Sequence, residues 1–489
     1  MANDTKRFQE IISHCKEYGF IFPSSEIYDG LAAVYDYGQW GSELKKNLRD
    51  YWWKSMTQLQ ENIVGIDAAI FMHPTTWKAS GHVDNFNDPM IDNKDSKKRY
   101  RVDHLIEAQA DLLKAEGKEK EGADLIALME GFLAKDDYVG LKKLIGDNKI
   151  KCAVSGTANW TDIRQFNLMF STEFGSTASS EEADNIVYLR PETAQGIFVN
   201  FLNVQKTGRM KIPFGIAQVG KAFRNEIVAR QFVFRMREFE QMEMQFFIRP
   251  GSQNEWYEFW KEERLKWHLS LGTPSEKYRY HNHPKLAHYA IAACDIEYDF
   301  PIGFKEVEGI HSRGDFDLSQ HQQFSKKKMQ YFDNDIDEKT GKPFGNYIPY
   351  VIETSIGLDR MFLLIMSNAY TEEDLSTLEK QDSRVVLKLP PNLAPIKLAI
   401  LPLVKKDGLP EIARDIMNKC KPHFRCFYEE KDAIGKRYRR MDALGTPFCI
   451  TIDHQTKEDN TVTIRYRDSM LQDRISINNI KEIVEKQIS

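Results

Sequence analysis

Residues 220–247 read GKAFRNEIVARQFVFRMREFEQMEMQFF, and this stretch decides how the chain is interpreted. The preceding segment, 210–219, alternates apolar and polar residues as a half-buried strand does. The alternation stops after Phe223 and resumes at Val233. From there one face carries Arg235, Arg237, Phe239, Gln241 and Glu243, and the other carries Met236, Met242 and Met244. We therefore predict two antiparallel strands joined by a long loop, 225–232, with arginines at both ends.

The second of these strands contains Glu238, Glu240 and Glu243, although glutamate is a poor strand former. A strand that accepts several charges usually presents some of them to a ligand. An exposed edge strand of mixed charge is the alternative. The pattern therefore indicates a binding surface.

A match to the Gly-rich phosphate-binding loop lies close by and is rejected. Residues 215–221, GIAQVGK, fit its first seven positions, but Ala222 stands where a Ser or Thr hydroxyl must reach Mg²⁺. The context is also a strand entering a hairpin, whereas that loop joins a strand to a helix. Any ATP site in this chain must be built differently.

Composition sets the broad class. A chain of 489 residues is too long for one core, so we expect two or three domains. Hydrophobic residues at 42% and charged residues at 28% are typical of a soluble globular protein. The formal net charge of -5 means that any nucleic-acid ligand needs local basic patches. Six scattered cysteines, no signal peptide and no long apolar run predict a cytoplasmic protein that does not enter a membrane.

Several segments show helical spacing. We predict helices over 5–17, 41–60 and 254–272, and a charged, Ala-rich helical region over 103–146. In the second of these, Tyr51, Trp52 and Trp53 form a large aromatic surface. That surface fits either the core or a subunit interface.

Two further segments run from a strand into a helix. In 185–196, Glu192 is expected near the helix N-terminus, which favours a carboxylate. In 347–370, a strand is expected to end near Glu353, and Arg360 falls in the first turn of an apolar helix. A cation there opposes the macrodipole, but a bound anion reverses that effect, so Arg360 is interpreted as a nucleotide ligand.

A pair of glutamates is a candidate cation site. Glu306 and Glu308 are expected on one strand face, spaced as a divalent-cation clamp requires. Paired exposed carboxylates without a ligand are the alternative.

The C-terminal part alternates strands and helices. After a Leu- and Pro-rich linker, 386–396, strands are predicted at 397–401, 425–428, 448–452 and 461–465, and helices at 409–420, 434–443 and 478–486. This is a small α/β domain with a mixed sheet. Its basic run, residues 436–440, fits either phosphate contacts or an exposed helix face.

These stretches carry a resemblance. Residues 218–247 resemble motif 2 of the class II aminoacyl-tRNA synthetases, most closely of the single-chain, homodimeric glycyl-tRNA synthetases. Residues 30–56 are similar to motif 1, with Gln39-Trp40 in place of the usual Pro-Leu, and 347–366 to motif 3. The resemblance covers nearly the whole chain in family order.

The resemblance implies an α+β fold. Residues 1–388 would form an antiparallel-sheet catalytic domain with a helical insertion at 103–160, and 389–489 an α/β anticodon-binding domain. It implies a glycine–tRNA ligase that uses ATP and Mg²⁺, acts on tRNA(Gly) and dimerises through motif 1. No structural zinc is expected, because Asn93 and Asp95 stand where many relatives carry cysteines. A prolyl or threonyl enzyme, or a non-catalytic accessory subunit of the same fold, are the alternatives.

The resemblance also implies site residues, with Arg224 and Arg360 as the catalytic pair. The implied ATP site comprises Arg224, Asn225, Glu226, Phe234, Arg235, Met236, Arg237, Glu238, Phe239, Glu306, Val307, Gly357, Leu358, Asp359 and Arg360, with loop residues near Arg230. The implied glycine site comprises Arg101, Glu192, Phe239, Glu240, Gln241, Met242, Glu243, Arg313, Glu353, Thr354, Ser355, Ile356 and Gly357. Glu306 is the implied Mg²⁺ ligand.

Overall fold

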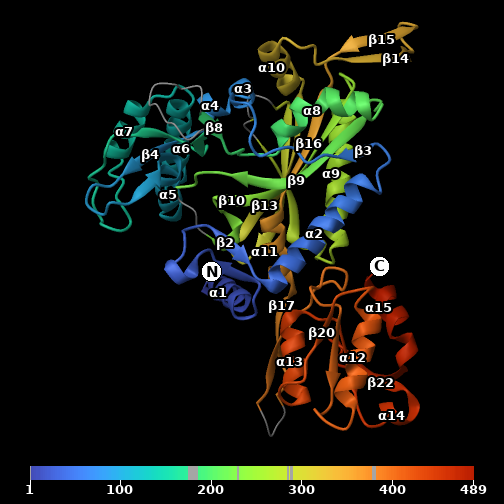
Figure 1. Ribbon diagram of the computed structural model, residues 1–489. Helices are drawn as coiled ribbons and strands as arrows, with labels where there is room; N and C mark the ends of the chain where they lie inside the picture. Colours follow the sequence, from blue (N-terminus) through green and yellow to red (C-terminus); the bar gives the residue numbers. More distant parts are fainter. Residues whose placement is uncertain are drawn as a thin grey trace.

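The computed structural model describes residues 2–174, 186–227, 231–283, 286, 290–376 and 381–488. Figure 1 shows a central sheet with helices, an insertion on its left and a C-terminal domain below it. The predicted combination of an antiparallel-sheet body, an insertion and a C-terminal α/β domain is therefore confirmed.

The centre of the molecule is a seven-stranded sheet with the order β11-β12-β13-β16-β10-β9-β3. Its strands are β3 (Ile63–Gly65), β9 (Phe214–Phe223), β10 (Glu238–Ile248), β11 (Tyr278–Asn282), β12 (Ala292–Phe300), β13 (Gly303–Gly314) and β16 (Tyr350–Gly357). Every pairing in it is antiparallel except that of β3 with β9. The two strands of the predicted hairpin, β9 and β10, are neighbours, and β10 also pairs with the middle strand, β16.

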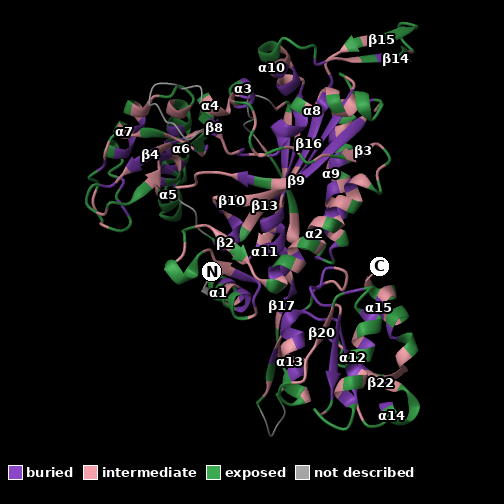
Figure 2. Ribbon diagram, viewed as in Figure 1, coloured by how far each residue is buried: buried purple, intermediate pink, exposed green. Residues whose placement is uncertain are grey.

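The two faces of this sheet differ, and strand alternation explains why. On β10, Met242, Met244 and Phe246 pack into the main apolar core with helices α2 (Gln39–Thr57), α9 (Gln253–Ser270) and α11 (Leu358–Ala369). Helix α8 (Ala194–Thr207) covers part of the other face, where Phe214 and Phe247 are buried. The polar residues at alternate positions of β10 therefore share the face of Phe247, and β10 changes from intermediate exposure at Glu238–Gln241 to buried from Met242 onward (Figure 2).

The hairpin was predicted correctly, but its second strand starts later than expected. Residues Phe232–Phe234 form a short 3-10 helix, η3, and β10 begins at Glu238. Gln231 and Phe232 have positive φ angles of 73° and 57°, which end the extended conformation there. Phe232, Val233 and Phe234 are all buried in this short helix. Buried apolar residues are also typical of a core strand, so the prediction began the strand too early. Arg230 lies outside the described residues.

Two other boundaries also differ from the prediction. Helix α8 begins at Ala194, so Pro191 and Glu192 precede the helix. Strand β16 does not end near Glu353 but continues to Gly357, because it pairs with β10 and β13 on both sides.

The insertion contains more than helices. Helices α5 (Val102–Ala115), α6 (Glu119–Leu133) and α7 (Tyr138–Asp147) are as expected. They pack with a three-stranded sheet of β4 (Asn87–Asp92), β5 (Arg99–Arg101) and β6 (Arg164–Asn167), and the insertion has its own apolar core. The strands were missed because they are short and polar, and so show no apolar alternation.

Two turns of the insertion are joined by hydrogen bonds around Asn93, which is fully buried. Its side-chain oxygen accepts bonds from the backbone N–H groups of Asp95 and Ser96 and from the Ser155 hydroxyl. Its amide donates to the Thr157 carbonyl. Polar side chains thus connect the turns in the region where no zinc was expected.

The C-terminal domain is a five-stranded mixed sheet with the order β20-β19-β21-β22-β23. Its elements are β19 (Leu398–Pro402), α12 (Leu409–Cys420), β20 (Cys426–Tyr428), α13 (Ile434–Leu444), β21 (Phe448–Ile452), α14 (Thr456–Asp459), β22 (Thr461–Tyr466), β23 (Gln472–Ser476) and α15 (Ile480–Ile488). All predicted strands and helices of this domain are confirmed. Strand β23 was missed because it is a polar edge strand.

The remaining elements connect these parts. They are α1 (Ala2–Glu17), β1 (Ile21–Pro23), η1 (Glu26–Tyr28), β2 (Tyr35–Tyr37), α3 (Pro74–Ala79), α4 (His82–Asn85), β7 (Ser171–Glu173), β8 (Ile186–Tyr188), η4 (Ser275–Lys277), α10 (Phe316–Ser325), β14 (Tyr331–Asp337), β15 (Lys342–Tyr347), β17 (Tyr370–Asp374), β18 (Ser383–Leu387) and η5 (Ile477–Asn479). Within the described ranges, no helix has the length and apolarity needed to cross a membrane.

The C-terminal domain is attached through more than its linker. Hairpin β17–β18 packs along α13, as Figure 1 shows. Arg384 of β18 is 3% exposed and donates to Glu373, to Asp442 of α13 and to the Arg467 carbonyl. Buried charges therefore join the two domains.

We predict that Arg384→Met lowers the free energy of unfolding by about 1–3 kcal/mol, because the buried Arg467 carbonyl loses a donor and buried Asp442 keeps only Arg465. Urea denaturation measures the change. Arg439→Met is the matched control. It breaks the more exposed pair with Asp382, where about 1 kcal/mol or less is expected. Equal effects of the two substitutions would contradict the prediction.

Candidate active site

A cavity of ≈ 470 Å³ opens on the polar face of the central sheet. Strands β10, β13 and β16 form its floor, and loops from α4, the insertion and the β9–β10 hairpin form its walls. The expected site residues that line it are Arg101, Glu192, Arg224, Glu226, Phe234, Arg235, Met236, Phe239, Gln241, Glu243, Glu306, Arg313, Glu353, Ser355, Gly357, Asp359 and Arg360. Residues far apart in sequence are thus brought to one place.

Two buried carboxylates and a third, partly exposed one gather at one side of this cavity. Glu243 of β10 and Glu353 of β16 are 2% and 4% exposed, and Glu192 lies just before α8. Burial alone would raise the pKa of Glu192, but His82, 3.4 Å away, and Arg313 lower it to about 2. Acidic side chains therefore gather in this part of the cavity.

The positive charge of Arg313 compensates part of the negative charge of this group. Its guanidinium donates to Glu353 at 2.7 Å and to both carboxylate oxygens of Asp317 in α10. Burial opposes the ionised form of Glu353, but Arg313, His311 and Gln245 hold its pKa well below the usual range. Glu353 is therefore a carboxylate at neutral pH.

Glu243 behaves differently from its neighbours. Burial, together with the charges of Glu353 and Glu192, raises its pKa well above the usual value. The Thr193 hydroxyl donates to one of its oxygens, and the Gln245 amide donates to the other at 2.8 Å. Glu243 is the member of the group that holds a proton most readily.

His311 was missed by the sequence reasoning. It lines the cavity, and its Nδ1 lies 2.7 Å from Glu353. Burial alone would lower the pKa of His311, but the hydrogen bond to Glu353 and the charge of Glu353 raise it. Alternation along the strand with Arg313 could have identified it. The cavity walls also include Asn85, Phe86, Asn87 and Asp88, from a segment that carried no motif.

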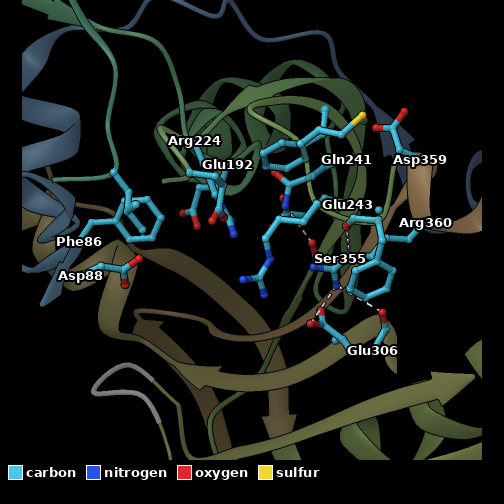
Figure 3. Close-up of a pocket in the computed structure, with 18 of the residues that line it drawn as sticks. Phe86, Asp88, Glu192, Arg224, Gln241, Glu243, Glu306, Ser355, Asp359 and Arg360 are labelled. Carbon is cyan, nitrogen blue, oxygen red and sulfur yellow. Dashed lines mark hydrogen bonds and ion pairs between the residues drawn. The ribbon is translucent and has the colours of Figure 1, made fainter. Parts of the chain in front are cut away.

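The other side of the cavity is basic and aromatic. The guanidinium of Arg224 lies between the rings of Phe86 and Phe239, 5.5 Å and 5.3 Å from their centroids. Arg360, in the first turn of α11 as predicted, pairs with Glu306 at 2.9 Å and lies 4.6 Å from the Phe234 ring. Figure 3 shows Arg224 beside Glu192, and Arg360 beside Glu306. Guanidinium groups and aromatic rings together suit a nucleotide with several phosphates.

The predicted carboxylate clamp is wrong. The pairing of β12 with β13 shifts between Glu306 and Glu308, so Val307 forms a bulge that turns the two side chains to opposite faces. Glu306 lines the cavity, whereas Glu308 is fully buried beneath α9 and pairs with Arg264 and His268.

The other expected site residues have side chains outside the cavity lining. They are Asn225, Arg237, Glu238, Glu240, Met242, Val307, Thr354, Ile356 and Leu358. Met242, Val307, Ile356 and Leu358 belong to the apolar core, since they face the helices. Glu238 pairs with Lys221, and Arg237 donates to the carbonyls of Glu226 and Ala32.

Asp359 and Glu240 are used to join α2 to the cavity wall. Lys45 of α2 contacts Asp359 at 2.7 Å and Glu240 at 3.1 Å. Asp359 also accepts a hydrogen bond from Tyr37 and from the backbone N–H of Glu240. The motif 1 segment therefore holds the start of α11, where Arg360 lies.

The basic run of the C-terminal domain is largely paired within the protein. Arg437 is buried and donates to the carbonyls of Pro402, Leu403 and Glu429. Arg439 pairs with Asp382, and Arg440 with Glu429 and Asp432. Arg439 and Arg440 remain 36% and 35% exposed, so contact of this run with phosphates stays a prediction.

Across the described ranges, no group of three or more His, Cys, Asp or Glu side chains is arranged to hold a metal ion. Glu306 supplies a carboxylate at the basic side of the cavity. One carboxylate fits Mg²⁺ that is bound mainly by substrate phosphates.

Comparison with known families agrees with this geometry. Residues 172–369 match the tRNA synthetase class II core domain (G, H, P, S and T). Residues 397–487 match an anticodon binding domain, and segments 88–124 and 116–168 match glycyl-tRNA synthetase insertion domain 1. The last match includes β4–β6, the sheet that the sequence reasoning missed.

Comparison with curated proteins is more specific. The chain is 52% identical to the glycine–tRNA ligase of Chlorobaculum tepidum over 481 residues, which cover 98% of this chain and 99% of that protein. It is 50% identical to that of Macrococcus caseolyticus, with 99% of both chains covered, and 49% identical to that of Treponema denticola, with 96% and 94% covered. The chain therefore belongs to the glycine–tRNA ligase family of class II aminoacyl-tRNA synthetases.

Proposed function

We propose that the cavity holds glycine over its acidic side and ATP along its basic side. The amino group of glycine would face Glu192, Glu243 and Glu353, and the triphosphate would lie between Arg224 and Arg360. The observation that carries this proposal is the division of one cavity into an acidic and a basic side.

The chemistry is the two-step reaction of a glycine–tRNA ligase. The glycine carboxylate attacks the α-phosphorus of ATP, and pyrophosphate leaves. The nucleophile is already ionised, so catalysis requires alignment of the reactants and neutralisation of charge, which the two guanidinium groups supply. In the second step, a terminal ribose hydroxyl of tRNA(Gly) attacks the carbonyl carbon of the glycyl-adenylate, and AMP leaves.

Selection of glycine would depend on its ammonium group and on exclusion of larger side chains. Gln241 and Ser355 line the cavity beside the three glutamates. Gln241 also accepts a hydrogen bond from the Thr193 backbone, so its side chain is fixed. Fixed polar side chains leave no apolar space for a larger amino acid.

Mg²⁺ would be held by the ATP phosphates together with Glu306. When bound, the ion neutralises part of the phosphate charge. Arg360 pairs with Glu306, and the charge of Arg360 is the main reason that the pKa of Glu306 is lowered. Glu306 is therefore ionised and ready to accept a cation.

The assembly follows the family. We assign 1–388 to the catalytic domain and 389–489 to the anticodon-binding domain, and we place the enzyme in the cytoplasm.

The homodimer would form through motif 1. A groove of ≈ 670 Å³ between α2 and α9, lined by Tyr51, Leu59 and Trp267 among others, is the surface that a second copy would cover.

Glu192→Gln and Glu353→Gln are expected to raise the KM for glycine by about tenfold or more, because each removes a charge facing the ammonium group. Glycine-dependent pyrophosphate exchange measures this. Glu297→Gln, on β12 and outside the cavity, is the charge-matched control. Wild-type exchange by both cavity variants would remove the assignment.

Arg360→Lys is expected to lower kcat by about 10²-fold, because an ammonium group cannot reproduce the guanidinium fork. The same exchange assay, with ATP varied, measures it. Arg279→Lys is a close control, since Arg279 also pairs with a glutamate and lies over a phenylalanine ring, but outside the cavity. An equal loss in the two variants would argue against a role for Arg360 in catalysis.

Leu59→Asp is expected to shift the protein from dimer to monomer in sedimentation experiments. Leu59 is 66% exposed beside the α2–α9 groove, and a carboxylate there would be buried by the second copy. Leu471→Asp, at a similarly exposed leucine of the C-terminal domain, is the control. An unchanged dimer in the Leu59 variant would place the interface elsewhere.

A further inference from the structure

Beneath the acidic side of the cavity lies a glutamine that the reaction does not touch. Gln245 is fully buried on β10, directly opposite Glu353 in the pairing with β16. Its amide nitrogen donates to Glu353 at 2.7 Å and to Glu243 at 2.8 Å. One side chain therefore joins two of the three carboxylates.

We propose that Gln245 is a positioning residue that holds Glu243 and Glu353 together for the substrate ammonium group without neutralising their charge. The inference rests on the proposed placement of glycine. It deepens that proposal, because it assigns the spacing of the ammonium site to a residue outside the cavity lining.

The neutral charge of the Gln245 amide is its important property. An amide can donate hydrogen bonds to two carboxylates, as a lysine or arginine side chain can, but it carries no charge. A cation at this position would compete with the substrate for the same carboxylates. Arg313 already compensates Glu353 and Asp317. A neutral bridge therefore keeps the remaining negative charge for glycine.

Both hydrogen bonds of the Gln245 amide nitrogen go to the two carboxylates. Its side-chain oxygen is buried and has no hydrogen-bond partner among the described residues. An unpaired buried acceptor is costly. That cost is tolerated here because the amide nitrogen faces the two carboxylates.

The bridge also affects protonation. A hydrogen bond to the ionised form lowers the pKa of a carboxyl group, and Gln245 is one of the groups that lower the pKa of Glu353. The charged and titratable groups that face the two carboxylates are Glu192, Arg190, His311, Arg313 and Asp317. None of them replaces the bond from Gln245 to Glu243.

The main test is Gln245→Met, which keeps the length of the side chain and removes both N–H donors. Loss of hydrogen bonds to charged groups predicts a KM for glycine raised about 10- to 100-fold, with the KM for ATP unchanged. Glu243 binds the ammonium group in its ionised form, and loss of the Gln245 donor raises the already raised pKa of Glu243 further. The rise of kcat/KM for glycine with pH should therefore move to higher pH.

A second variant separates charge from spacing. Gln245→Lys still bridges the carboxylates, but its ammonium group neutralises one charge. It should fold as stably as the wild type by thermal unfolding and still lose about 100-fold or more in kcat/KM for glycine. The control is Gln218→Met. Gln218 is a fully buried glutamine on β9, opposite Glu243 in register, and its amide bonds only a backbone carbonyl among the described residues. Its kinetics should be those of the wild type.

The outcomes distinguish this inference from the placement of glycine. If Glu353→Gln impairs glycine activation but Gln245→Met leaves the KM and the pH profile unchanged, the positioning role is refuted and the glycine site stands. If Gln245→Met raises both KM values equally and lowers the thermal midpoint, its role is structural only, and the proposal also fails. If Glu353→Gln has no effect either, both assignments fall.

Discussion

The ion pairs that Arg313 makes with Glu353 and Asp317 are the interactions on which the site depends. A buried carboxylate without a partner would take up a proton or destabilise the fold by several kcal/mol. Arg313 is itself 4% exposed, so the acidic side of the cavity is stabilised from within the sheet. Gln195 extends this network, since it donates to both Glu192 and Asp317. The acidic side of the cavity can therefore remain ionised inside the protein and still attract a cation.

The central sheet separates chemistry from packing by alternation. On β10 and β16, successive residues point alternately to the cavity and to the helices, which is why Glu353 and Ser355 are in the site while Ile352 and Ile356 are in the core. The bulge at Val307 reverses this order within β13. Because of the bulge, Glu306 pairs with Arg360 on the cavity face, and Glu308 pairs with residues of α9 on the other face.

Much of this structure could be predicted from the sequence. The hairpin, the motif 3 strand and helix, and the C-terminal domain follow from periodicity, and the resemblance placed most cavity residues. Three features could not be predicted, for physical reasons. A bulge leaves no pattern of its own, so Glu308 was expected in the wrong place. The short strands of the insertion lack apolar alternation, and the glutamine bridge at Gln245 depends on the register between β10 and β16.

The anchoring of the C-terminal domain has a consequence for the RNA. Arg384 and the β17–β18 hairpin join α13 to the body that contains the cavity, and apolar residues of both domains share one core. The anticodon-binding domain is therefore held against the catalytic body by packing as well as by its linker. An RNA that reaches both the cavity and this domain must span the separation that these contacts set.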